Sequence, residues 1–249
     1  MFYDVNKELP GGMDVAVGDG TTGRRAGLDE DKVAVAALGL TAERGLNGWS
    51  MRDLAAALDV SPSVAYHYFP NRDAVVSRVL EEVGRLVERP DPQLPWKEWY
   101  IEVAVSLRRV LLAHNGVASL MQMTRFPRSL LFVVEVGFEK LHEAGFADMT
   151  PFAYSMIFNT ALGAIAARDY RSANERDRRV SLDDTAAGLG SCAHGSPAVL
   201  ELLEGFIVPL SIEDRTGGPY EMSDRYFGLI MRSILNGIES TLLGGGSGA

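Results

Sequence analysis

Residues 50–73 read SMRDLAAALDVSPSVAYHYFPNRD, which is the pattern of two short helices joined by a tight turn. Ser50 and Asp53 have the spacing of a capping box, in which each side chain binds the backbone N–H of the other residue. Apolar residues follow at helical spacing, so this pair predicts a helix over residues 51–57.

A second helix is predicted directly after a turn at Asp59 and Val60. Ser61 is the expected N-cap, and Pro62 then occupies the first helical position, where its missing N–H and fixed φ cost nothing. This helix is expected to end near Tyr68.

The exposed side of the second predicted helix is rich in hydroxyl groups and aromatic rings. Ser61, Ser63, Tyr66, His67 and Tyr68 fall within two turns, and such groups are good partners for phosphate oxygens. An aromatic run of this kind is also typical of a half-buried seam in a helical bundle. The paired caps and the tight turn favour DNA recognition over that alternative.

The segment resembles the N-terminal domain of the TetR family of transcriptional regulators. The similarity is densest at residues 60–61 (VS) and 66–73 (YHYFPNRD), and it extends over about residues 28–83. Three positions depart from the family pattern: Asp59 replaces the usual turn glycine, Ala65 stands where a larger apolar residue is common, and Arg72 replaces the usual lysine.

The resemblance implies an all-α protein with an N-terminal three-helix, helix-turn-helix DNA-binding domain and a C-terminal helical domain for effector binding and dimerisation. Pro62, Val64 and His67 are expected to face the bases, while a second set contacts phosphates: Ser61, Ser63, Tyr66, Tyr68 and Arg72. Ser50 and Arg52 are further expected DNA contacts. The basic pair Arg24 and Arg25 precedes the first helix, where it fits either a minor-groove arm or an ordinary solvated terminus.

Composition agrees with this interpretation. The chain has 249 residues, 47% of them apolar, which is ample for a sizeable core. The net charge is −9. Basic and acidic residues nearly balance within the helix-turn-helix region, so most of the excess negative charge lies in the rest of the chain. Cys192 is the single cysteine, so an intramolecular disulfide is excluded. No apolar run spans a bilayer and no signal peptide is evident, so we expect a cytoplasmic protein.

The apolar spacing predicts helices throughout and no strands. We expect a flexible arm over residues 1–27, the DNA-binding domain with its linker helix over 28–89, the effector and dimerisation domain over 90–243, and a flexible tail over 244–249. Within this outline, two polar, glycine-rich segments are predicted to be loops. The predicted helices cover residues 28–44, 51–57, 62–68, 71–86, 96–114, 115–123, 128–144, 150–171, 197–207 and 220–243, and the loops cover 172–195 and 210–219.

Two of the later helices carry broad apolar stripes with small residues among them. The stripes either form a dimer interface, as the family resemblance implies, or belong to the core of one chain. A dimer is favoured because two reading helices one DNA turn apart recognise a palindrome. The predicted interface residues are Phe152, Met156, Thr160, Ala164, Phe227, Ile230, Met231, Ile234 and Ile238.

The region between Trp96 and Phe158 is the expected effector pocket. It combines aromatic and methionine side chains with a few polar groups, which is the composition of a small-molecule site for a hydrophobic ligand. Gln122 and Asn159 are expected inside apolar helices, where a ligand would supply their missing partner. The candidate residues are Trp99, His114, Met121, Gln122, Met123, Phe126, Phe132, Glu135, Phe158 and Asn159.

No catalytic constellation, metal-ligand spacing or cofactor motif is found, so the prediction includes no catalytic residues, metal or cofactor. We therefore expect a homodimeric repressor that leaves a palindromic operator when a hydrophobic small molecule binds. Two alternatives remain: a helical lyase-like or isomerase-like enzyme, and a regulator that responds to a protein partner. The sequence identifies neither the operator nor the ligand.

Overall fold

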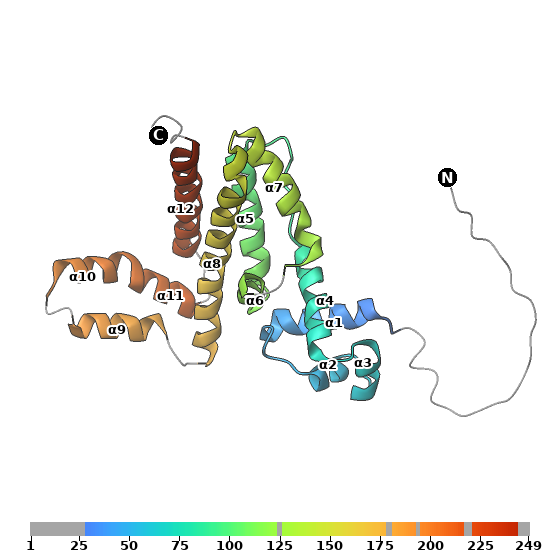
Figure 1. Cartoon of the computed structure of the whole chain (residues 1–249). Helices are drawn as coiled ribbons and strands as arrows, with labels where there is room; N and C mark the ends of the chain where they lie inside the picture. The colour runs from blue at the N-terminus through green and yellow to red at the C-terminus, as the bar shows by residue number, and fades with distance from the viewer. Residues whose placement is uncertain (1–27, 124–125, 178–180, 193–194, 217–220, 244–249) are drawn as a thin grey trace, which may run out of the picture.

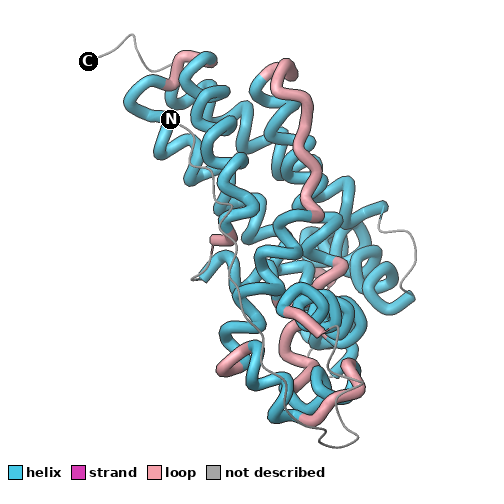
Figure 2. Tube along the Cα trace, turned by 90° about the vertical axis from the view of Figure 1, so that its right-hand side faces the viewer, coloured by secondary structure: helices cyan, strands magenta, loops and turns pink. Residues whose placement is uncertain are grey.

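The computed structural model describes residues 28–123, 126–177, 181–192, 195–216 and 221–243, and these residues form helices and connecting turns without a strand (Figures 1 and 2). Four helices form an N-terminal group that is joined to a larger helical bundle. The group consists of α1 (Glu30–Arg44), α2 (Met51–Ala57), α3 (Pro62–Tyr68) and α4 (Arg72–Arg85).

The N-terminal group is held together by α1, which packs against α4, α2 and α3, while α2 and α3 pack against each other. The side chains of Val33, Leu54, Val75 and Val79 are fully buried between them. Asn71 caps α4 by accepting a hydrogen bond from the N–H of Ala74 at 2.9 Å. α4 then leaves the group and runs into the bundle (Figure 1), so it contributes to both parts of the molecule.

The bundle contains α5, α7, α8 and α12, with α6 at the end nearest α1 (Figure 1). Its largest buried side chains include Trp99 and Leu111 from α5, Ile165 from α8 and Met231 from α12. The helices are α5 (Trp96–Leu112), α6 (Val117–Met123), η2 (Arg128–Leu130), α7 (Leu131–Glu143), η3 (Ala147–Met149), α8 (Thr150–Asp177), α12 (Glu221–Ile238) and the terminal η5 (Glu239–Leu243).

The segment between α8 and α12 projects sideways from the bundle as a helical hairpin (Figure 1). We call it the arm. It is built from α9 (Leu182–Cys192), α10 (Pro197–Leu202), the π-helical turn η4 (Leu203–Ile207) and α11 (Val208–Thr216).

The arm corrects the prediction of loops over 172–195 and 210–219. Ser181 and Asp184 exchange hydrogen bonds at the start of α9: the Asp184 N–H donates to the Ser181 hydroxyl at 3.1 Å, and the Ser181 N–H donates to the Asp184 carboxylate at 3.0 Å. This is the same Ser-x-x-Asp capping pattern as at residues 50–53. Asp183 then accepts hydrogen bonds from Ser211 and Arg215, which ties α9 to α11.

Candidate DNA-binding and effector sites

The turn between α2 and α3 has the geometry that the sequence predicts. Ser50 and Asp53 form the capping box, with the Ser50 N–H donating to Asp53 at 2.8 Å and the Asp53 N–H donating to the Ser50 hydroxyl at 3.3 Å. The hydroxyl and N–H of Ser50 lower the pKa of Asp53. Asp59 adopts a left-handed conformation with φ +53°, which Asp tolerates better than most residues in place of glycine.

α3 exposes most of the side chains that were predicted to contact DNA. Ser61, Pro62, Ser63 and His67 are exposed, and Tyr66 is 49% exposed. The two serine hydroxyls lie 2.9 Å apart. On the opposite side Ala65 is fully buried and Val64 is half-buried, so α3 rests on its apolar face and presents a polar one. α3 lies at the far end of the molecule from the C-terminal end of α12 (Figure 1).

Two predicted phosphate contacts point into the protein instead, which corrects their assignment. The Tyr68 hydroxyl donates to the carbonyl of Leu28 at 2.7 Å. The Arg72 guanidinium donates to the carbonyls of Leu46 and Trp49 and lies 4.7 Å from the centre of the Trp49 ring. Because their donor groups bind the backbone, Tyr68 and Arg72 hold α3 and α4 in place.

The remaining predicted DNA contacts fall into three groups. Ser50 is occupied by the capping box, and its hydroxyl also donates to Asp53 at 2.6 Å. Arg52 is exposed on α2 next to this cap. Arg24 and Arg25 lie outside the described residues.

The predicted effector residues divide into buried and exposed side chains. Trp99, His114, Met121 and Phe132 are buried. The Nδ1 atom of His114 lies 2.8 Å from the carbonyl of Val110, so Nδ1 carries the proton and donates. The side chain of Met123 is outside the described residues.

Gln122 and Asn159 are exposed, contrary to the prediction that they lie inside apolar helices, and the Asn159 amide donates to Ser155 at 3.1 Å. Glu135 is exposed as well. Water can satisfy these groups, so a ligand is not required to pair them. The spacing of apolar residues predicted helices in this region, and helices are present. The spacing alone does not show which face of each helix packs against the rest of the chain.

Aromatic rings nevertheless form a continuous row, which we call the aromatic wall: Phe126 before η2, Phe138 on α7, and Tyr154 and Phe158 on α8. Tyr154 and Phe158 stack with an interplanar angle of 9° and a centroid distance of 5.7 Å. Phe126 lies 5.6 Å from Phe158, and Phe138 lies 5.1 Å from Tyr154. Phe126 is 39% exposed, so the wall opens to solvent at this end.

Tyr100 and Tyr154 were not predicted as site residues. Both hydroxyl oxygens are buried and have no hydrogen-bond partner among the described residues. Burial, together with the neighbouring Tyr154, raises the pKa of Tyr100, and burial raises the pKa of Tyr154 to about 12. In a sequence, a tyrosine on an otherwise apolar helix face is a candidate for a buried hydroxyl. The sequence does not show whether that hydroxyl has a hydrogen-bond partner in the fold.

Two hollows lie on the other side of α5. A groove of about 570 Å³ runs between α5 and α12, and a cavity of about 250 Å³ lies between α8, α12 and the arm. Arg108 and Phe227 line both. Neither is lined by a residue that was predicted to bind the ligand.

The predicted dimer stripes divide into an outer and an inner part. Phe152 and Met156 are 61% and 42% exposed, and Thr160, Ala164, Ile230 and Ile234 are half-buried. Phe227, Met231 and Ile238 are at most 3% exposed because they pack against the rest of the same chain, so their assignment to the interface is wrong. Tyr226 and Leu229, at 44% and 48% exposed, lie on the outer side of α12 instead.

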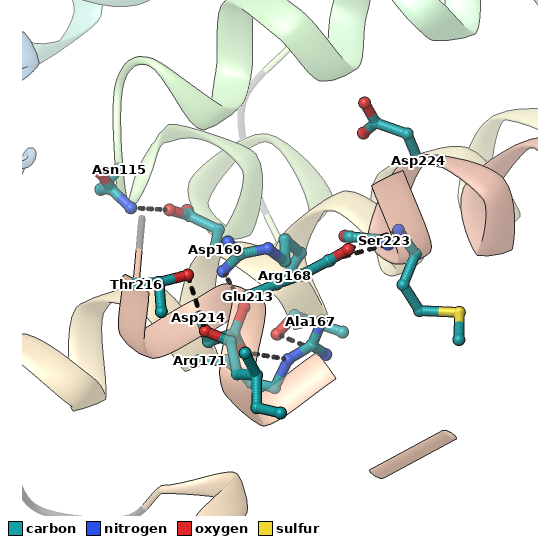
Figure 3. A network of polar contacts seen from close by, with 12 residues as sticks. Asn115, Ala167, Arg168, Asp169, Arg171, Glu213, Asp214, Thr216, Ser223 and Asp224 are labelled. Atoms are coloured by element: carbon teal, nitrogen blue, oxygen red, sulfur yellow. Dashed lines mark hydrogen bonds and ion pairs between the residues drawn. The ribbon is translucent and has the colours of Figure 1, made fainter. Parts of the chain in front are cut away.

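A polar network connects the arm and the bundle (Figure 3) and continues to the N-terminal helices through Asn115. Asp169 on α8 accepts hydrogen bonds from the Asn115 side chain and the Gly116 N–H, both at 2.7 Å. The Asn115 carbonyl in turn accepts from the N–H of Leu46 at 2.7 Å. The turn before α6 is therefore held by α8 on one side and touches the end of α1 on the other.

The arm is attached to the same part of α8 by a buried ion pair. The Asp214 carboxylate on α11 has no exposed side-chain surface and lies 2.8 Å from Arg168 and 3.2 Å from Arg171 (Figure 3). Because Arg168 precedes Asp169 directly, one turn of α8 contacts both the arm and the turn that touches α1.

A second contact between the two parts of the molecule is made by α4. Glu81 accepts hydrogen bonds from the N–H groups of Arg128 and Ser129 at 2.8 and 2.9 Å, at the start of η2. Partial burial favours a higher pKa for Glu81, but these hydrogen bonds outweigh it and leave the pKa lowered. Gly84 permits the close approach, because a Cβ there would lie 2.1 Å from the Ser129 hydroxyl.

The N-terminal helices match a family model described as bacterial regulatory proteins of the tetR family, over residues 34–79. An HTH-type transcriptional regulator from Saccharopolyspora erythraea is 30% identical over 160 residues, which cover 62% of this chain and 67% of that protein. The chain belongs to the TetR family. The matched residues run from α1 into α4 and include the whole of α2 and α3.

Other TetR-family proteins resemble the chain beyond the matched helices. The class D tetracycline repressor protein of Escherichia coli is 28% identical over 165 residues, covering 64% of this chain and 75% of the relative. The crystal structure of ActR from Streptomyces coelicolor in complex with actinorhodin is 25% identical and superposes with a TM-score of 0.67, covering 90% of this chain and all of ActR. The helical bundle is thus shared as well as the N-terminal group.

Membership of the TetR family makes this protein a DNA-binding transcriptional regulator and removes the enzyme alternative. None of the helices in the described residues is long and apolar enough to span a membrane.

Proposed function

We propose that the protein is a homodimeric repressor that binds a palindromic operator through α3 and releases it when a hydrophobic small molecule binds in the helical bundle. The observation that carries this proposal is the exposed polar face of α3, which is set at a fixed angle by the capping box and the left-handed Asp59. We further propose that the protein acts in the cytoplasm, where such an operator is accessible.

The DNA contacts that this geometry supports are Ser61, Pro62, Ser63, Tyr66 and His67 on α3, with Arg52 on α2. Hydroxyl and guanidinium groups bind phosphate oxygens and fix the register of a reading helix, whereas side chains facing the groove read base edges. Only one of these residues carries a full charge, so we expect few phosphate contacts and a modest salt dependence.

Two copies of α3 recognise a palindrome when the chains pair about a two-fold axis. We propose that they pair through the outer faces of α8 and α12, with Phe152, Met156, Leu229 and Tyr226 in the contact. Large exposed apolar side chains on two adjacent helices are typical of such an interface. The domain boundary that we propose is Arg89–Pro90, just after α4.

In a dimer, the two α3 helices must have the spacing that fits the operator. The ligand response requires that the effector binds more tightly to a conformation with a different α3 spacing than to the operator-binding conformation. α4 is suited to transmit this change, since it belongs to the N-terminal group and is also clamped to η2 through Glu81. A coupling of about 1–3 kcal/mol gives a useful switch. A regulator that responds to a protein partner would use the same route, and effector screening with the purified protein separates the two.

The test is binding of the purified protein to its own promoter-proximal DNA, followed by fluorescence anisotropy. Tyr66→Ala and Arg52→Ala should each weaken specific binding about tenfold, the equivalent of ~1.4 kcal/mol. Arg225→Ala is the matched control, because Arg225 is exposed on α12, outside the N-terminal group. Binding with no preference over a pool of genomic fragments contradicts the proposal.

A further inference from the structure

The cavity between α8, α12 and the arm, which we call the joint cavity, has walls from separate parts of the chain. It measures about 250 Å³ and is lined by residues of α5, α8, α9, η4, α11 and α12. Ala167 and Tyr226 belong to this lining and both reach solvent, so the joint cavity is accessible from outside. No residue of the aromatic wall lines it, so it is a separate place in the molecule.

The polar part of this lining is basic. Arg108, Arg168 and Arg171 all line the joint cavity, and none of its lining residues in the described part of the chain is acidic. Arg108 and Arg168 are only 6% and 4% exposed. A guanidinium group stays charged when it is buried, and it donates hydrogen bonds but accepts none. A molecule that enters the joint cavity therefore binds best if it carries a negative charge.

Two of these guanidinium groups have a terminal nitrogen available for such a molecule. Arg108 uses Nε and Nη2 for its contacts with Asp224 and Ser223. Arg171 uses Nε and Nη1 for its contacts with Asp214 and the α8 backbone. Within the described residues, neither Nη1 of Arg108 nor Nη2 of Arg171 has a hydrogen-bond or ion-pair partner. Terminal guanidinium N–H groups bind carboxylate oxygens in short, charge-assisted hydrogen bonds.

The rest of the lining is apolar and partly aromatic. Phe206 and Ile207 come from the π-helical turn η4, and Phe227 comes from α12. The rings of Phe206 and Tyr226 meet edge to face, with their centres 4.8 Å apart. Aromatic walls favour flat rings, and π-helical turns are frequent at functional sites. The apolar part of the joint cavity thus suits an aromatic body.

The volume limits this body to one or two rings. An apolar cavity of about 150 Å³ holds benzene, whereas sites for drug-sized ligands begin near ~300 Å³. The joint cavity lies between these sizes at about 250 Å³.

The neighbouring groove between α5 and α12 fits an anion less well. Arg108 and Phe227 line it too, but Asp224 is part of its lining and repels a negative charge. Arg171 does not line this groove, so a second available guanidinium group is missing there.

We propose that the joint cavity binds a compact aromatic carboxylate. The carboxylate accepts hydrogen bonds from Arg108 and Arg171, and the ring lies among the side chains of Phe206, Tyr226 and Phe227. The inference goes beyond the proposed function, since this site is separate from the aromatic wall and needs no operator.

Binding here would fasten the arm to the bundle, because the walls of the joint cavity come from both. Arg108 belongs to α5 and Arg171 to α8, whereas Phe206 belongs to the arm. A carboxylate held by the two arginines and covered by Phe206 should therefore slow hydrogen exchange in α9 and α11.

The experiment titrates three probes into the full-length protein by isothermal titration calorimetry. They are 2-naphthoate, 2-naphthamide, which has the same rings without the charge, and acetate, which has the charge without the rings. Hydrogen exchange of α9 and α11 is then compared with and without 2-naphthoate.

Two variants change the joint cavity. Arg171→Gln removes one available guanidinium and leaves the pair between Asp214 and Arg168 in place. Ala167→Leu adds bulk at the opening without removing a side-chain contact, so its fold should be retained.

Two further variants are the matched controls. Arg215→Gln removes an exposed arginine of the same arm that pairs with Asp183 and does not line the joint cavity. Phe126→Ala removes a partly exposed ring of the aromatic wall, so it reports binding on that side of the bundle.

The wild type should bind 2-naphthoate at least about tenfold more tightly than either other probe. Arg171→Gln and Ala167→Leu should each weaken 2-naphthoate binding about tenfold, and both controls should bind it like the wild type. Arg171→Gln should leave binding of the neutral 2-naphthamide unchanged. In the wild type, 2-naphthoate should slow exchange in α9 and α11.

The proposal is overturned if 2-naphthoate binds no more tightly than 2-naphthamide or acetate, or if Arg171→Gln and Ala167→Leu both bind it like the wild type. Loss of binding in Phe126→Ala alone would move the site to the aromatic wall and overturn it as well. Operator binding by the same proteins without a probe tests the proposed function separately.

Discussion

The Arg72 guanidinium makes contacts that a lysine cannot reproduce. It donates to two carbonyls, those of Leu46 and Trp49, while its flat face lies over the Trp49 ring. A lysine ammonium is a compact point charge and cannot combine the forked donation with the stacking. We expect Arg72→Lys to lower the free energy of unfolding by about 1–3 kcal/mol.

Denaturant unfolding measures this change, and Arg52→Lys is the control because Arg52 is exposed. The control should stay within about 0.5 kcal/mol of the wild type. Equal stability of the two variants would show that the Arg72 contacts contribute nothing to folding.

Tyr68 and Arg72 also show what the sequence could predict at this scale. The capping box follows from local chemistry and is confirmed, and Asp59 has a positive φ at the position of the usual turn glycine. The inward direction of the two long side chains depends on carbonyls at Leu28 and Leu46, which are distant in sequence. A motif identifies residue types, but it does not say which backbone groups the fold brings within their reach.

Glu81 is the point at which α4 holds the bundle. The N–H groups of Arg128 and Ser129 lower the pKa of the Glu81 carboxyl in the folded protein. The contact therefore stabilises the fold at pH values above the pKa that Glu81 has in the unfolded chain. The stabilisation is lost as the pH falls through the folded pKa. Because Glu81 is partly exposed and screened by solvent, we expect a contribution of no more than about 1 kcal/mol.

Glu81→Gln should therefore lower stability at neutral pH and flatten its decline below about pH 5. Unfolding curves across this range test the prediction, with Glu139→Gln as the control on the exposed side of α7. Parallel pH profiles for the wild type and Glu81→Gln would rule out the clamp as a source of acid sensitivity.

The arm is attached through one fully buried carboxylate. Asp214 pairs with Arg168 and Arg171, and Asp214→Asn would remove the negative charge that both guanidinium groups contact. Removing one member of a buried pair costs about 3–5 kcal/mol. We expect the arm to open locally, which hydrogen exchange detects as loss of protection in α9 and α11.

The matched control is Glu201→Gln on α10, which is exposed. It removes a carboxylate from the same arm without touching the pair. If exchange in α9 and α11 stays the same in Asp214→Asn, the arm is held by its apolar contacts alone.

The arm was also the element that sequence reasoning predicted least well. Its glycines, serines and charges suggested loops, and apolar periodicity was too weak to indicate helices. The helices are instead stabilised by the Ser181–Asp184 cap and by the bonds of Asp183 to Ser211 and Arg215. The cap is local and has the same Ser-x-x-Asp pattern as residues 50–53, so the sequence did contain this signal. The bonds of Asp183 join distant residues and leave no periodic signal, whereas the amphipathic helices of the bundle leave one.

Pairing of two chains is a property of the whole molecule. The outer face of α8 and α12 is apolar and exposed in one chain, so a charge there should separate a dimer without harming the fold. We expect Met156→Lys to give a monomer in sedimentation experiments and to weaken operator binding by more than tenfold.

Val35→Lys is the control for this substitution, because Val35 is 62% exposed on α1 and the chemical change is the same. It should sediment like the wild type. A Met156→Lys protein that stays dimeric would place the interface on another face of the molecule.

The last prediction concerns communication across the molecule. Asp169 on α8 holds Asn115 and Gly116, and the Asn115 carbonyl accepts from the Leu46 N–H next to the end of α1. Asp169→Asn keeps the shape of the side chain but removes the charge that both donors share. The turn should loosen, and the effect should reach Leu46 through the Asn115 carbonyl.

Hydrogen exchange at the Leu46 amide measures this directly. We expect about tenfold faster exchange in Asp169→Asn, equivalent to ~1.4 kcal/mol, while Asp148→Asn on the exposed η3 turn leaves it unchanged. The same loosening should reduce the effect of an effector on operator affinity, because coupling between sites requires an element that both can bias. If Leu46 exchanges at the wild-type rate, the turn at residues 114–116 is not a route from α8 to the DNA-binding helices, and α4 with its Glu81 clamp would have to carry the signal alone.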